Sequence, residues 1–386
     1  MILVENNFKN RDYLLNIRMS LKFGLISLGS VSSRMILEEA QKYFDEVDHV
    51  DIRKIEIHIT NKDTTVLYDG EPLKDYDCLY MKGSHKYATL LHGLTEIYKG
   101  KCFIPIDSNA HIIAHNKFMT HLQFSTNKSL KMPATYFAAK ISETKKFLKT
   151  LPYPIILKFP SGTHGKGVIF AESYSSASSM VDALDVFKQP LLVQDYVNIK
   201  SDIRVIVAGD KIIGSMRRIA KTDEIRANAH QGGSAEPYIV TPDVKRMSLD
   251  AAKQIKAGVC AVDIIESDYG PIILEVNTSP GLQKITEVTK KNIAAEIATY
   301  LYEETRKLRD LKDRAKTRDV MGSIGIEEIG ERDFETELTV RNNKIVLPEF
   351  AYKMSEFVEG ESVTIKVSKN KIELLRFDHD DDTFSL

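Results

Sequence analysis

Three side chains with oxygen ligands, Asp263, Glu275 and Asn277, lie within one segment of the chain, AVDIIESDYGPIILEVNTSP at residues 261–280. Two apolar runs flank the polar turn ESDYG, which predicts an antiparallel hairpin with Asp263 roughly opposite Glu275. Asn277 follows Glu275 by two positions and shares its face. Carboxylate and amide oxygens together suit a hard cation such as Mg²⁺. Solvent exposure of the carboxylates is the alternative, but unpaired charges on otherwise apolar strands are costly, so we favour the metal site.

A glycine-rich loop follows a second apolar strand. The segment KFPSGTHGKGV at 158–168 has Lys158 at the end of that strand and then Gly162, Gly165 and Gly167. It matches neither the Walker loop nor the dinucleotide-binding fingerprint. Glycines let a ligand approach the backbone, exposed N–H groups can cradle phosphate, and the lysine can neutralise phosphate charge. A plain glycine-rich turn explains the loop equally well, so alone it leaves both interpretations open.

Basic residues cluster on and near the strands between this loop and the hairpin. Guanidinium groups match carboxylates and phosphates with parallel hydrogen bonds, so several beside a Mg²⁺ site would clamp anionic substrates and a transferring phosphoryl group. The candidates are Arg204, Arg217, Arg218 and Arg226, with Asn228 and Lys117 elsewhere in the chain.

The strands that must position these groups fall into two blocks. Residues 21–108 alternate strands with helices, which predicts a parallel, doubly wound α/β sheet. Residues 109–304 contain closely spaced strands separated by hairpin turns, which predicts an α+β region with an antiparallel sheet. The expected elements of the first block are strands at 21–28, 50–59, 78–81 and 103–106 and a helix at 32–44.

The flanking segments have a different composition. Residues 1–20 are polar and irregular, and we expect an N-terminal extension there. Residues 305–332 begin with a run rich in Lys and Arg, for which a solvated helical linker is a better explanation than a phosphate-binding patch. The acidic residues 379–386 are expected to form a frayed tail.

The overall composition excludes several classes of protein. The chain has 386 residues, 53 Lys plus Arg, 54 Asp plus Glu and a formal net charge of -1. This balance argues against a nucleic-acid coat protein or a membrane-surface protein. No apolar run approaches the roughly 18 residues of a spanning helix, and the N-terminus lacks the pattern of a secretory signal. Three widely spaced cysteines match no disulfide or zinc pattern, which favours the reducing cytoplasm.

Together, these features resemble the ATP-grasp superfamily, and within it the RimK-like ligases of the ribosomal-protein S6 modification type. The resemblance covers residues 109–281 and rests on the order and spacing of six motifs, whereas residues 21–108 resemble the family's N-terminal preATP-grasp domain more weakly. The motifs are NKFMT at 116–120, PIILKFPSGTHGKGV at 154–168, LVQDYV at 192–197, DIRVIVAGDKIIGSMRRIAK at 202–221, RANAHQGGSA at 226–235 and AGVCAVDII…GPIILEVNTSPGL at 257–282.

The resemblance implies a nucleotide site at the loop and a hinge. Lys117 and Lys158 would contact ATP phosphates, with the loop at Gly162, Gly165 and Gly167 closing over them. Adenine and ribose would lie at the hinge formed by Gln194, Asp195, Tyr196 and Val197, with Asp202 on the ribose side. The family often has Glu where this chain has Asp195, which puts that side-chain contact in doubt but leaves the backbone contacts.

The resemblance also implies the metal and substrate groups. Asp263, Glu275 and Asn277 would hold Mg²⁺, as two ions, with Mn²⁺ as an alternative. Arg226 and Asn228 would lie near the phosphoryl and substrate groups. The acceptor carboxylate would lie near Arg204 and either Arg217 or Arg218.

The reaction implied by the family is carboxylate–amine ligation. An acceptor carboxylate attacks the γ-phosphate, and an amine such as glutamate displaces phosphate from the resulting acyl phosphate. The protein mainly positions groups and neutralises charge, so we nominate no side-chain nucleophile. Two alternatives are a DNA-binding regulator that senses a ligand and an ATP-grasp kinase that stops at a phosphorylated product.

A small β-rich unit is expected at residues 333–378. Two hairpins with turns at 342–343 and 369–370 flank a short helical pattern, and about 45 residues are too few to bury a stable core alone. The order resembles the AbrB/MazE-like swapped-hairpin domain, whose members dimerise by intertwining and often bind DNA. The first hairpin offers only Arg341 and Lys344, so we favour a homodimerisation module over a DNA-binding one.

Overall fold

The structure is a computed structural model that describes residues 20–162, 167–187, 189–197, 201–219, 234–267, 270–323, 339–341, 344–346, 362–368 and 371–376. Contacts within the chain divide it into two compact units, of which the first ends at Leu311 and the second begins at Lys312. All residues of the predicted site precede this division.

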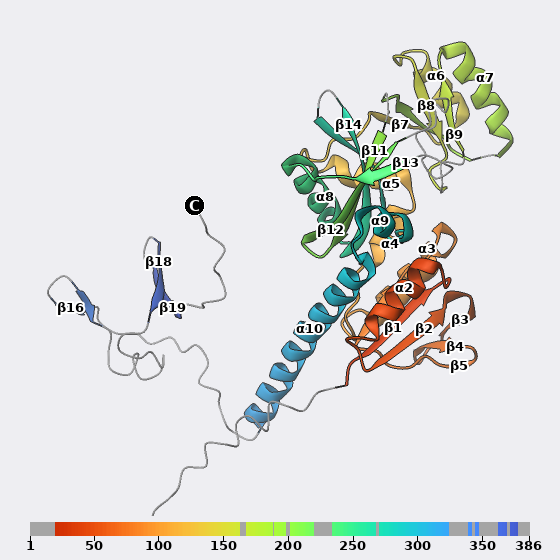
Figure 1. Ribbon diagram of the computed structural model, residues 1–386. Helices are drawn as coiled ribbons and strands as arrows, with labels where there is room; N and C mark the ends of the chain where they lie inside the picture. Colours follow the sequence, from red (N-terminus) through yellow and green to blue (C-terminus); the bar gives the residue numbers. More distant parts are fainter. Residues whose placement is uncertain are drawn as a thin grey trace, which may run out of the picture. The chain divides into compact units, whose positions relative to one another are not determined.

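Three parallel strands form the main sheet of the first block, in the order β2-β1-β6. Helix α2 shares a buried core with Phe23 and Leu25 on one face of the sheet, and α3 shares another with Leu79 and Met81 on the opposite face (Figure 1). This arrangement confirms the predicted doubly wound sheet. The elements are β1 (Lys22–Ser27), α2 (Val31–Ala40), β2 (Glu46–Asp51), β6 (Cys78–Met81) and α3 (Ala88–Tyr98).

Two of the strand predictions for this block are wrong. The predicted strand 50–59 is broken by a 3₁₀ turn at Ile52–Lys54, where the Asp51 carboxylate accepts a hydrogen bond from the Arg53 amide. Its second half joins a separate antiparallel sheet, β3-β4-β5, formed by Ile55–Ile59 (β3), Thr64–Tyr68 (β4) and Glu71–Pro72 (β5). The run 103–106 makes only isolated bridges, Cys78 to Phe103 and Ile106 to Ala257.

A four-stranded antiparallel sheet opens the second block, in the order β7-β10-β8-β9. Two helices, α6 and α7, pack on it through a core that includes Leu148, Leu157 and Val181 (Figure 1, upper part). The elements are β7 (Thr135–Phe137), α6 (Ile141–Leu148), β8 (Ile155–Lys158), β9 (Val168–Ala171), α7 (Tyr174–Leu184) and β10 (Leu192–Asp195).

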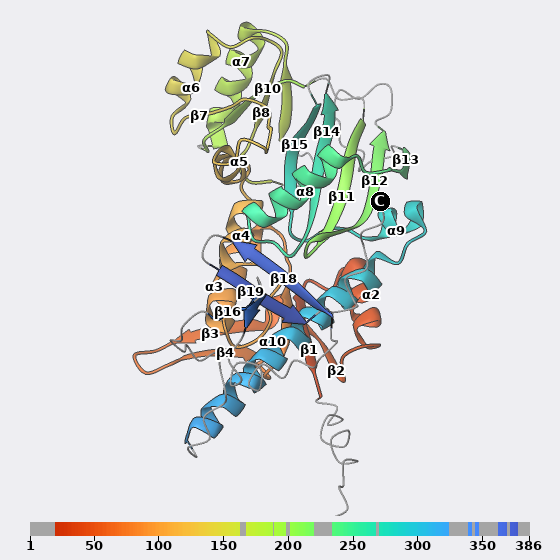
Figure 2. The same cartoon turned by 90° about the vertical axis from the view of Figure 1, so that its left-hand side faces the viewer.

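A five-stranded antiparallel sheet follows, in the order β13-β12-β11-β14-β15. Helix α8 lies across one face of this sheet (Figure 2), and buries Val244, Met247 and Ala251. This sheet and the Phe23 face of the first block share one buried core, so the two blocks are packed together. The elements are β11 (Ser201–Ala208), β12 (Lys211–Ile219), β13 (Ser234–Pro237), α8 (Pro242–Gln254), β14 (Val259–Ser267), β15 (Gly270–Asn277) and α9 (Gln283–Thr289).

Three further helices complete the first unit or leave it. Helices α4 (Ser108–Ala114) and α5 (Lys117–Ser125) connect the two blocks. Helix α10 (Ile293–Ser323) buries Ile297 and Leu301 in the shared core and continues past the division between the units. In the described residues, no helix is both long and apolar enough to cross a membrane.

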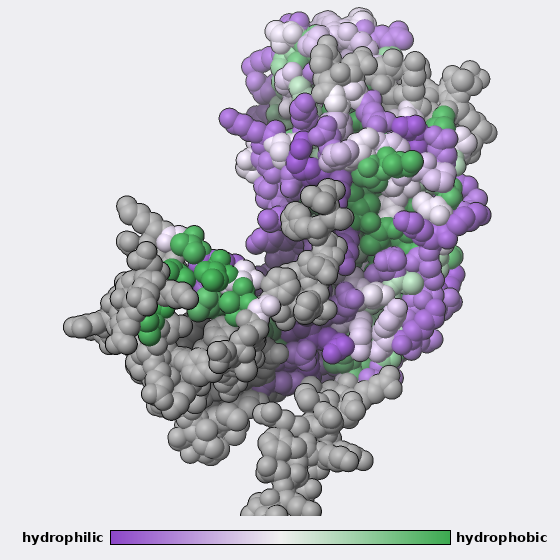
Figure 3. Space-filling view, turned by 60° about the vertical axis from the view of Figure 1, so that its left-hand side comes forward, coloured by the Kyte–Doolittle hydropathy of each residue, from purple (hydrophilic) through white to green (hydrophobic). Residues whose placement is uncertain are grey.

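The second unit contains the two predicted hairpins. The first pairs β16 (Thr339–Arg341) with β17 (Lys344–Val346), and the second pairs β18 (Val363–Ser368) with β19 (Lys371–Arg376). The helical pattern between them, at 348–357, lies outside the described residues, as does the acidic tail. Hydrophobic surface, coloured green, is visible on the second unit in Figure 3. The exposed apolar side chains of the two hairpins are Ile345, Val346, Ile365, Val367, Ile372 and Leu375.

Candidate active site

The hairpin of β14 and β15 has the predicted register. Asp263 pairs directly with Glu275, and Asn277 lies further along β15 opposite Ala261. The register shifts by one residue next to Asp263, which bends the pair at this point. The sequence therefore predicted correctly which two carboxylates meet across the strands.

The two carboxylates have opposite environments. Asp263 is 2% exposed. Its burial alone would raise its pKa, but Arg204 and Arg218 hold the pKa well below the ordinary value. Glu275 reaches solvent. However, protein atoms crowd its other sides, and this desolvation together with the Asp263 charge raises the pKa of Glu275 against the opposing effect of Lys117. One carboxylate is thus fixed as an anion, and the other lies where a cation would stabilise its charge.

A buried ion cluster surrounds Asp263. Arg204 donates from Nε and Nη2 to the two Asp263 oxygens at 2.8 and 2.7 Å. The Arg218 guanidinium lies 2.9 Å from Asp263 Oδ2 and also donates to Asp202, with Nε 2.9 Å from Oδ2. Burial raises the pKa of Asp202 to about 6 in spite of Arg218. Asp202 is 2% exposed and bound to Arg218, so in this structure its side chain faces the ion cluster.

Arg217 and Arg218 point in opposite directions, because neighbouring residues of a strand alternate between faces. Arg217 forms an ion pair with Glu266 at 2.7 Å, and its guanidinium carbon lies 5.0 Å from the centre of the Tyr238 ring. Arg218 therefore joins the cluster with Arg204, and Arg217 does not.

The two predicted phosphate-binding lysines lie near the hairpin. Lys117 is the first residue of α5, and its Nζ donates to the Gly162 carbonyl at 2.9 Å. Lys158 ends β8 and donates to Gln194 Oε1 at 2.6 Å. Desolvation lowers the pKa of Lys117, and desolvation followed by the Lys117 charge lowers the pKa of Lys158 to about 8, with Glu275 opposing both shifts. The two cations and Glu275 therefore act on one another electrostatically.

The ends of the glycine-rich loop and the hinge are also described. Gly167 has a φ of +78°, and a Cβ there would lie 2.9 Å from Phe159 Cδ2, so glycine is required on two grounds. In the hinge, Asp195 Oδ1 is buried and has no hydrogen-bond partner in the described part of the chain, and burial raises the pKa of Asp195. Tyr196, one residue on, packs edge-on against Phe170, and Val197 follows it. Gly165, Arg226 and Asn228 lie outside the described residues.

Sequence reasoning missed a polar network behind the hinge. Gln194 Nε2 lies 2.9 Å from Thr135 Oγ1 and 3.3 Å from His121 Nε2, and the Thr135 hydroxyl lies 3.1 Å from His121 Nδ1. This network fixes the Gln194 amide group, whose oxygen accepts a hydrogen bond from the Lys158 ammonium. Polar residues on apolar elements were the available signal, but they are far apart in the sequence.

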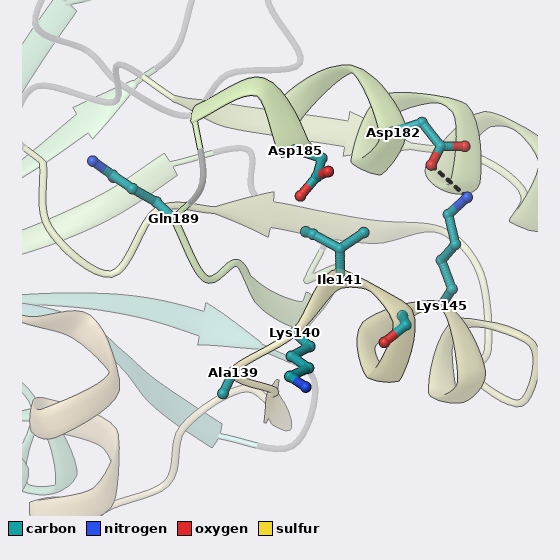
Figure 4. Close-up of a pocket in the computed structure, with 8 residues that line it drawn as sticks. Ala139, Lys140, Ile141, Lys145, Asp182, Asp185 and Gln189 are labelled. Atoms are coloured by element: carbon teal, nitrogen blue, oxygen red, sulfur yellow. Dashed lines mark ion pairs between the residues drawn. The ribbon is translucent and has the colours of Figure 1, made fainter.

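A cavity of about 490 Å³ lies elsewhere in the second block. Figure 4 shows its eight lining residues, which come from α6, α7 and the adjoining loops, with the ion pair of Lys145 and Asp182 at 2.5 Å on one side. None of the predicted site residues lines it, so we treat it as separate from the candidate site.

The donor set is compatible with a divalent cation. Across the described residues, no group of three or more His, Cys, Asp or Glu side chains could hold a metal. The predicted set instead combines two carboxylates with the Asn277 amide oxygen, which accepts from the Ser279 amide at 2.8 Å. A carboxylate has about four lone-pair positions. The arginines occupy three of those on Asp263, which leaves one on Oδ1 for a metal.

Comparison with known proteins identifies the family. The model of the RimK-like ATP-grasp domain matches residues 114–301. A "Probable alpha-L-glutamate ligase" of Pseudoalteromonas translucida is 31% identical over 301 residues, which are 77% of this chain and the whole of that protein. The chain belongs to the RimK-like ATP-grasp family. A ligase of the same description from Methanococcoides burtonii is 32% identical over 74% of this chain and 95% of its own length.

A solved structure supports the ATP-grasp fold. The ATP-grasp ligase PsnB, complexed with a phosphomimetic variant of its minimal precursor, Mg and ADP, matches 74% of this chain and 99% of its own with a TM-score of 0.57 and 15% identity. At this identity the likeness shows the fold alone. The sequence relatives show that this chain is an ATP-grasp ligase of the RimK-like type, and PsnB is a ligase of this fold whose structure holds Mg and ADP.

Proposed function

We propose that this ligase forms an amide bond between a carboxylate acceptor and glutamate or a similar amino acid, through an acyl phosphate. The supporting observation is the pairing of Asp263 with Glu275 beside Lys117 and Lys158, which collects two anions and two cations at one place. Such a site can neutralise the charge of a transferring phosphoryl group and hold it in line with an attacking oxygen.

Each group has a proposed role. Bound ATP with Mg²⁺, or Mn²⁺ in its place, would supply the phosphoryl group and the charge that polarises it. Lys117 and Lys158 contact its phosphates, and the segment from Gln194 to Val197 holds adenine and ribose. Glu275 and Asn277 would ligate the metal together with Asp263. Arg226 and Asn228 act near the phosphoryl group.

The arginine cluster takes a modified role in this proposal. The resemblance assigns Arg204 and either Arg217 or Arg218 to the acceptor carboxylate, but Arg204 and Arg218 already bind Asp263 in bonds of 2.7 to 2.9 Å. Their first task is then to keep Asp263 ionised and oriented, since a ligand carboxylate would have to compete with a buried pair.

The test is a screen of amino acids against acceptors, read by ADP release and product mass. Candidate acceptors are a protein C-terminus and small acids that already bear glutamate. ADP release that requires both an acid and an amine supports the ligase, whereas release with the acid alone and a stable phosphorylated product would support the kinase alternative.

Two single substitutions on the β14–β15 hairpin make the test specific. Glu275→Ala is expected to abolish turnover by removing a metal ligand. Glu266→Ala, on the same hairpin but paired with Arg217 and Tyr238, is the matched control and should retain activity. Wild-type turnover in the Glu275 variant would refute the site assignment.

We further propose that the second unit joins two copies of the chain, as in swapped-hairpin domains. The support is the exposed apolar surface of its hairpins, where Val367 is 73% and Ile365 58% exposed, more than solvated hairpins normally carry. Light scattering should find a dimer for the wild type and a monomer for Val367→Lys with Ile365→Lys. A monomeric wild-type protein would exclude this role, and a salt-sensitive shift of a DNA fragment would favour the regulator alternative.

A further inference from the structure

Lys82 occupies the edge of a parallel sheet where ligands usually bind. It directly follows β6, and its amide donates to the Ile26 carbonyl of β1 at 2.9 Å, so it lies at the carboxyl edge of the β2-β1-β6 sheet. At the same edge, β1 turns through Gly29, with a φ of +72°, into Ser30, the N-cap of α2. Ligands of open α/β sheets bind beyond this edge, and the start of a helix there favours negative charge.

The Lys82 side chain is buried without a counter-ion. It is 5% exposed, and within the described residues its ammonium forms no ion pair. Its Nζ lies over the Tyr80 ring, 5.9 Å from the ring centre. Desolvation lowers the pKa of Lys82 to about 8. A buried, uncompensated ammonium is costly, and a bound anion would remove most of that cost.

The side chain shares the strand face that is turned toward the second block. Leu79 and Met81 pack into the core under α3, whereas Tyr80 belongs to the core shared with the five-stranded sheet. Lys82 is two residues after Tyr80 and continues that face.

A chain of hydrogen bonds connects the residue after Lys82 to the end of the β14–β15 hairpin. The next residue, Gly83, donates its amide to Ser279 Oγ at 2.9 Å and accepts from the same hydroxyl at 3.0 Å. The Ser279 amide in turn donates to Asn277 Oδ1 at 2.8 Å. Lys82 is therefore held against the end of β15, beside the place where phosphoryl transfer is proposed.

The other buried cations of this region already have partners. Arg204 and Arg218 bind Asp263, Lys158 binds Gln194, and Lys117 binds the Gly162 carbonyl. We propose that Lys82 binds a carboxylate of the acceptor substrate at the junction of the two blocks. This assignment rests on the proposed ligase function and adds the residue that recognises the acceptor.

The binding test uses the full-length protein and simple carboxylates as probes. Acetate, succinate, glutarate and L-glutamate are titrated by calorimetry in the presence of Mg·ADP into the wild type, Lys82→Met, Lys82→Arg and Lys86→Met. A charge-assisted contact predicts binding weaker by about tenfold or more in Lys82→Met, with partial recovery in Lys82→Arg. Lys86, exposed four residues further on, is the control and should bind as the wild type does.

The outcomes separate this proposal from the ligase function. Unchanged probe binding in Lys82→Met overturns it, and so does a wild-type protein that binds none of the four carboxylates. Mg·ADP affinity should be equal in all variants. A wild-type protein that does not bind Mg·ADP would refute the proposed function instead. With an acceptor from the screen, Lys82→Met should raise the acceptor KM and leave kcat within about twofold; a loss of kcat at unchanged KM would indicate a proton acceptor for the amine and overturn carboxylate binding.

Because Lys82→Met removes a buried charge, its free energy of unfolding should equal or exceed that of the wild type. A large loss of stability would mean that the ammonium has a structural partner, which would overturn the proposal.

Discussion

At the scale of single residues, Asp263 is the group on which the most interactions converge. Two guanidiniums share its carboxylate inside the protein, and Glu275 faces it across the strands. A buried charge pair is balanced only while both sides are present, because the remaining partner is otherwise left uncompensated. Asp263 should therefore matter for folding as well as for metal binding, whereas Glu275, which reaches solvent, should matter for metal binding.

Asp263→Asn and Glu275→Gln should separate these two effects. Removing the Asp263 charge leaves Arg204 and Arg218 with Asp202 alone, and the expected loss is about 3 to 5 kcal/mol in the free energy of unfolding. Glu275→Gln removes a charge whose pKa is raised, so stability should change by less than about 0.5 kcal/mol while turnover is lost. Urea denaturation beside an ADP-release assay measures both, and equal destabilisation of the two variants would contradict this division.

A buried histidine should make the protein sensitive to acid. His111 is fully buried, and neither ring nitrogen has a hydrogen-bond partner in the part of the chain that is described. Desolvation, followed by the His115 and His92 charges, lowers the pKa of His111 to about 3. Between pH 6.5 and about 3 the unfolded chain therefore binds a proton that the folded protein does not, so stability falls as pH falls, by about 1.4 kcal/mol per pH unit for this group.

The measurement is the free energy of unfolding at pH 7, 6 and 5. In His111→Leu, the free energy of unfolding should change less steeply with pH than in the wild type. The control is His58→Gln, at an exposed histidine that faces Glu56, and it should leave this pH dependence unchanged. An unchanged slope in His111→Leu would show that other groups govern the acid transition.

At the scale of elements, the sequence predicts best those contacts that form within one short segment of the chain. The pairing of Asp263 with Glu275 follows from two apolar strands and the turn between them. Which of Arg217 and Arg218 joins the cluster does not, because it depends on the register of β12 with β11, which sets the side chain that shares a face with Arg204 and Asp263. That register is not encoded in any one segment. The break at Ile52–Lys54 was missed because valine and isoleucine recur on both sides of it, and the network of His121 with Gln194 joins residues 73 positions apart.

The alternation along β12 gives a matched pair of substitutions. Arg218→Gln leaves Asp202 and part of Asp263 uncompensated inside the sheet and should cost about 3 to 5 kcal/mol of stability. Arg217→Gln, one residue away, removes half-exposed ion pairs to Glu266 and Glu236 and should cost less than about 1 kcal/mol. Thermal unfolding compares them directly, and a reversed order would mean that the two side chains exchange faces.

At the scale of the whole molecule, a near-neutral chain contains a charge-rich interior. The formal net charge is -1, yet the site places buried cations and anions next to one another. This chain is also longer than the Pseudoalteromonas ligase, since 77% of this chain covers the whole of that protein. Part of this chain therefore has no counterpart there.

A chain that ends at Ser323, the last residue of α10, should consequently keep the nucleotide site. We expect Mg·ADP affinity within about twofold of the full-length protein, because the paired carboxylates and both lysines precede the division at Leu311. Calorimetry measures the affinity and light scattering the oligomeric state. A shortened chain that folds but no longer binds Mg·ADP would mean that the second unit contributes to the site.

The bond from Lys117 to the Gly162 carbonyl has a consequence for how nucleotide affinity is interpreted. Nζ lies 2.9 Å from that oxygen. An ammonium has three N–H donors, so under the proposed assignment Lys117 holds the carbonyl with one of them and a phosphate oxygen with another. One cation would then join the backbone at Gly162 to the nucleotide. Lys117→Met would therefore remove the backbone contact together with the phosphate contact, and the measured fall in nucleotide affinity would contain both losses.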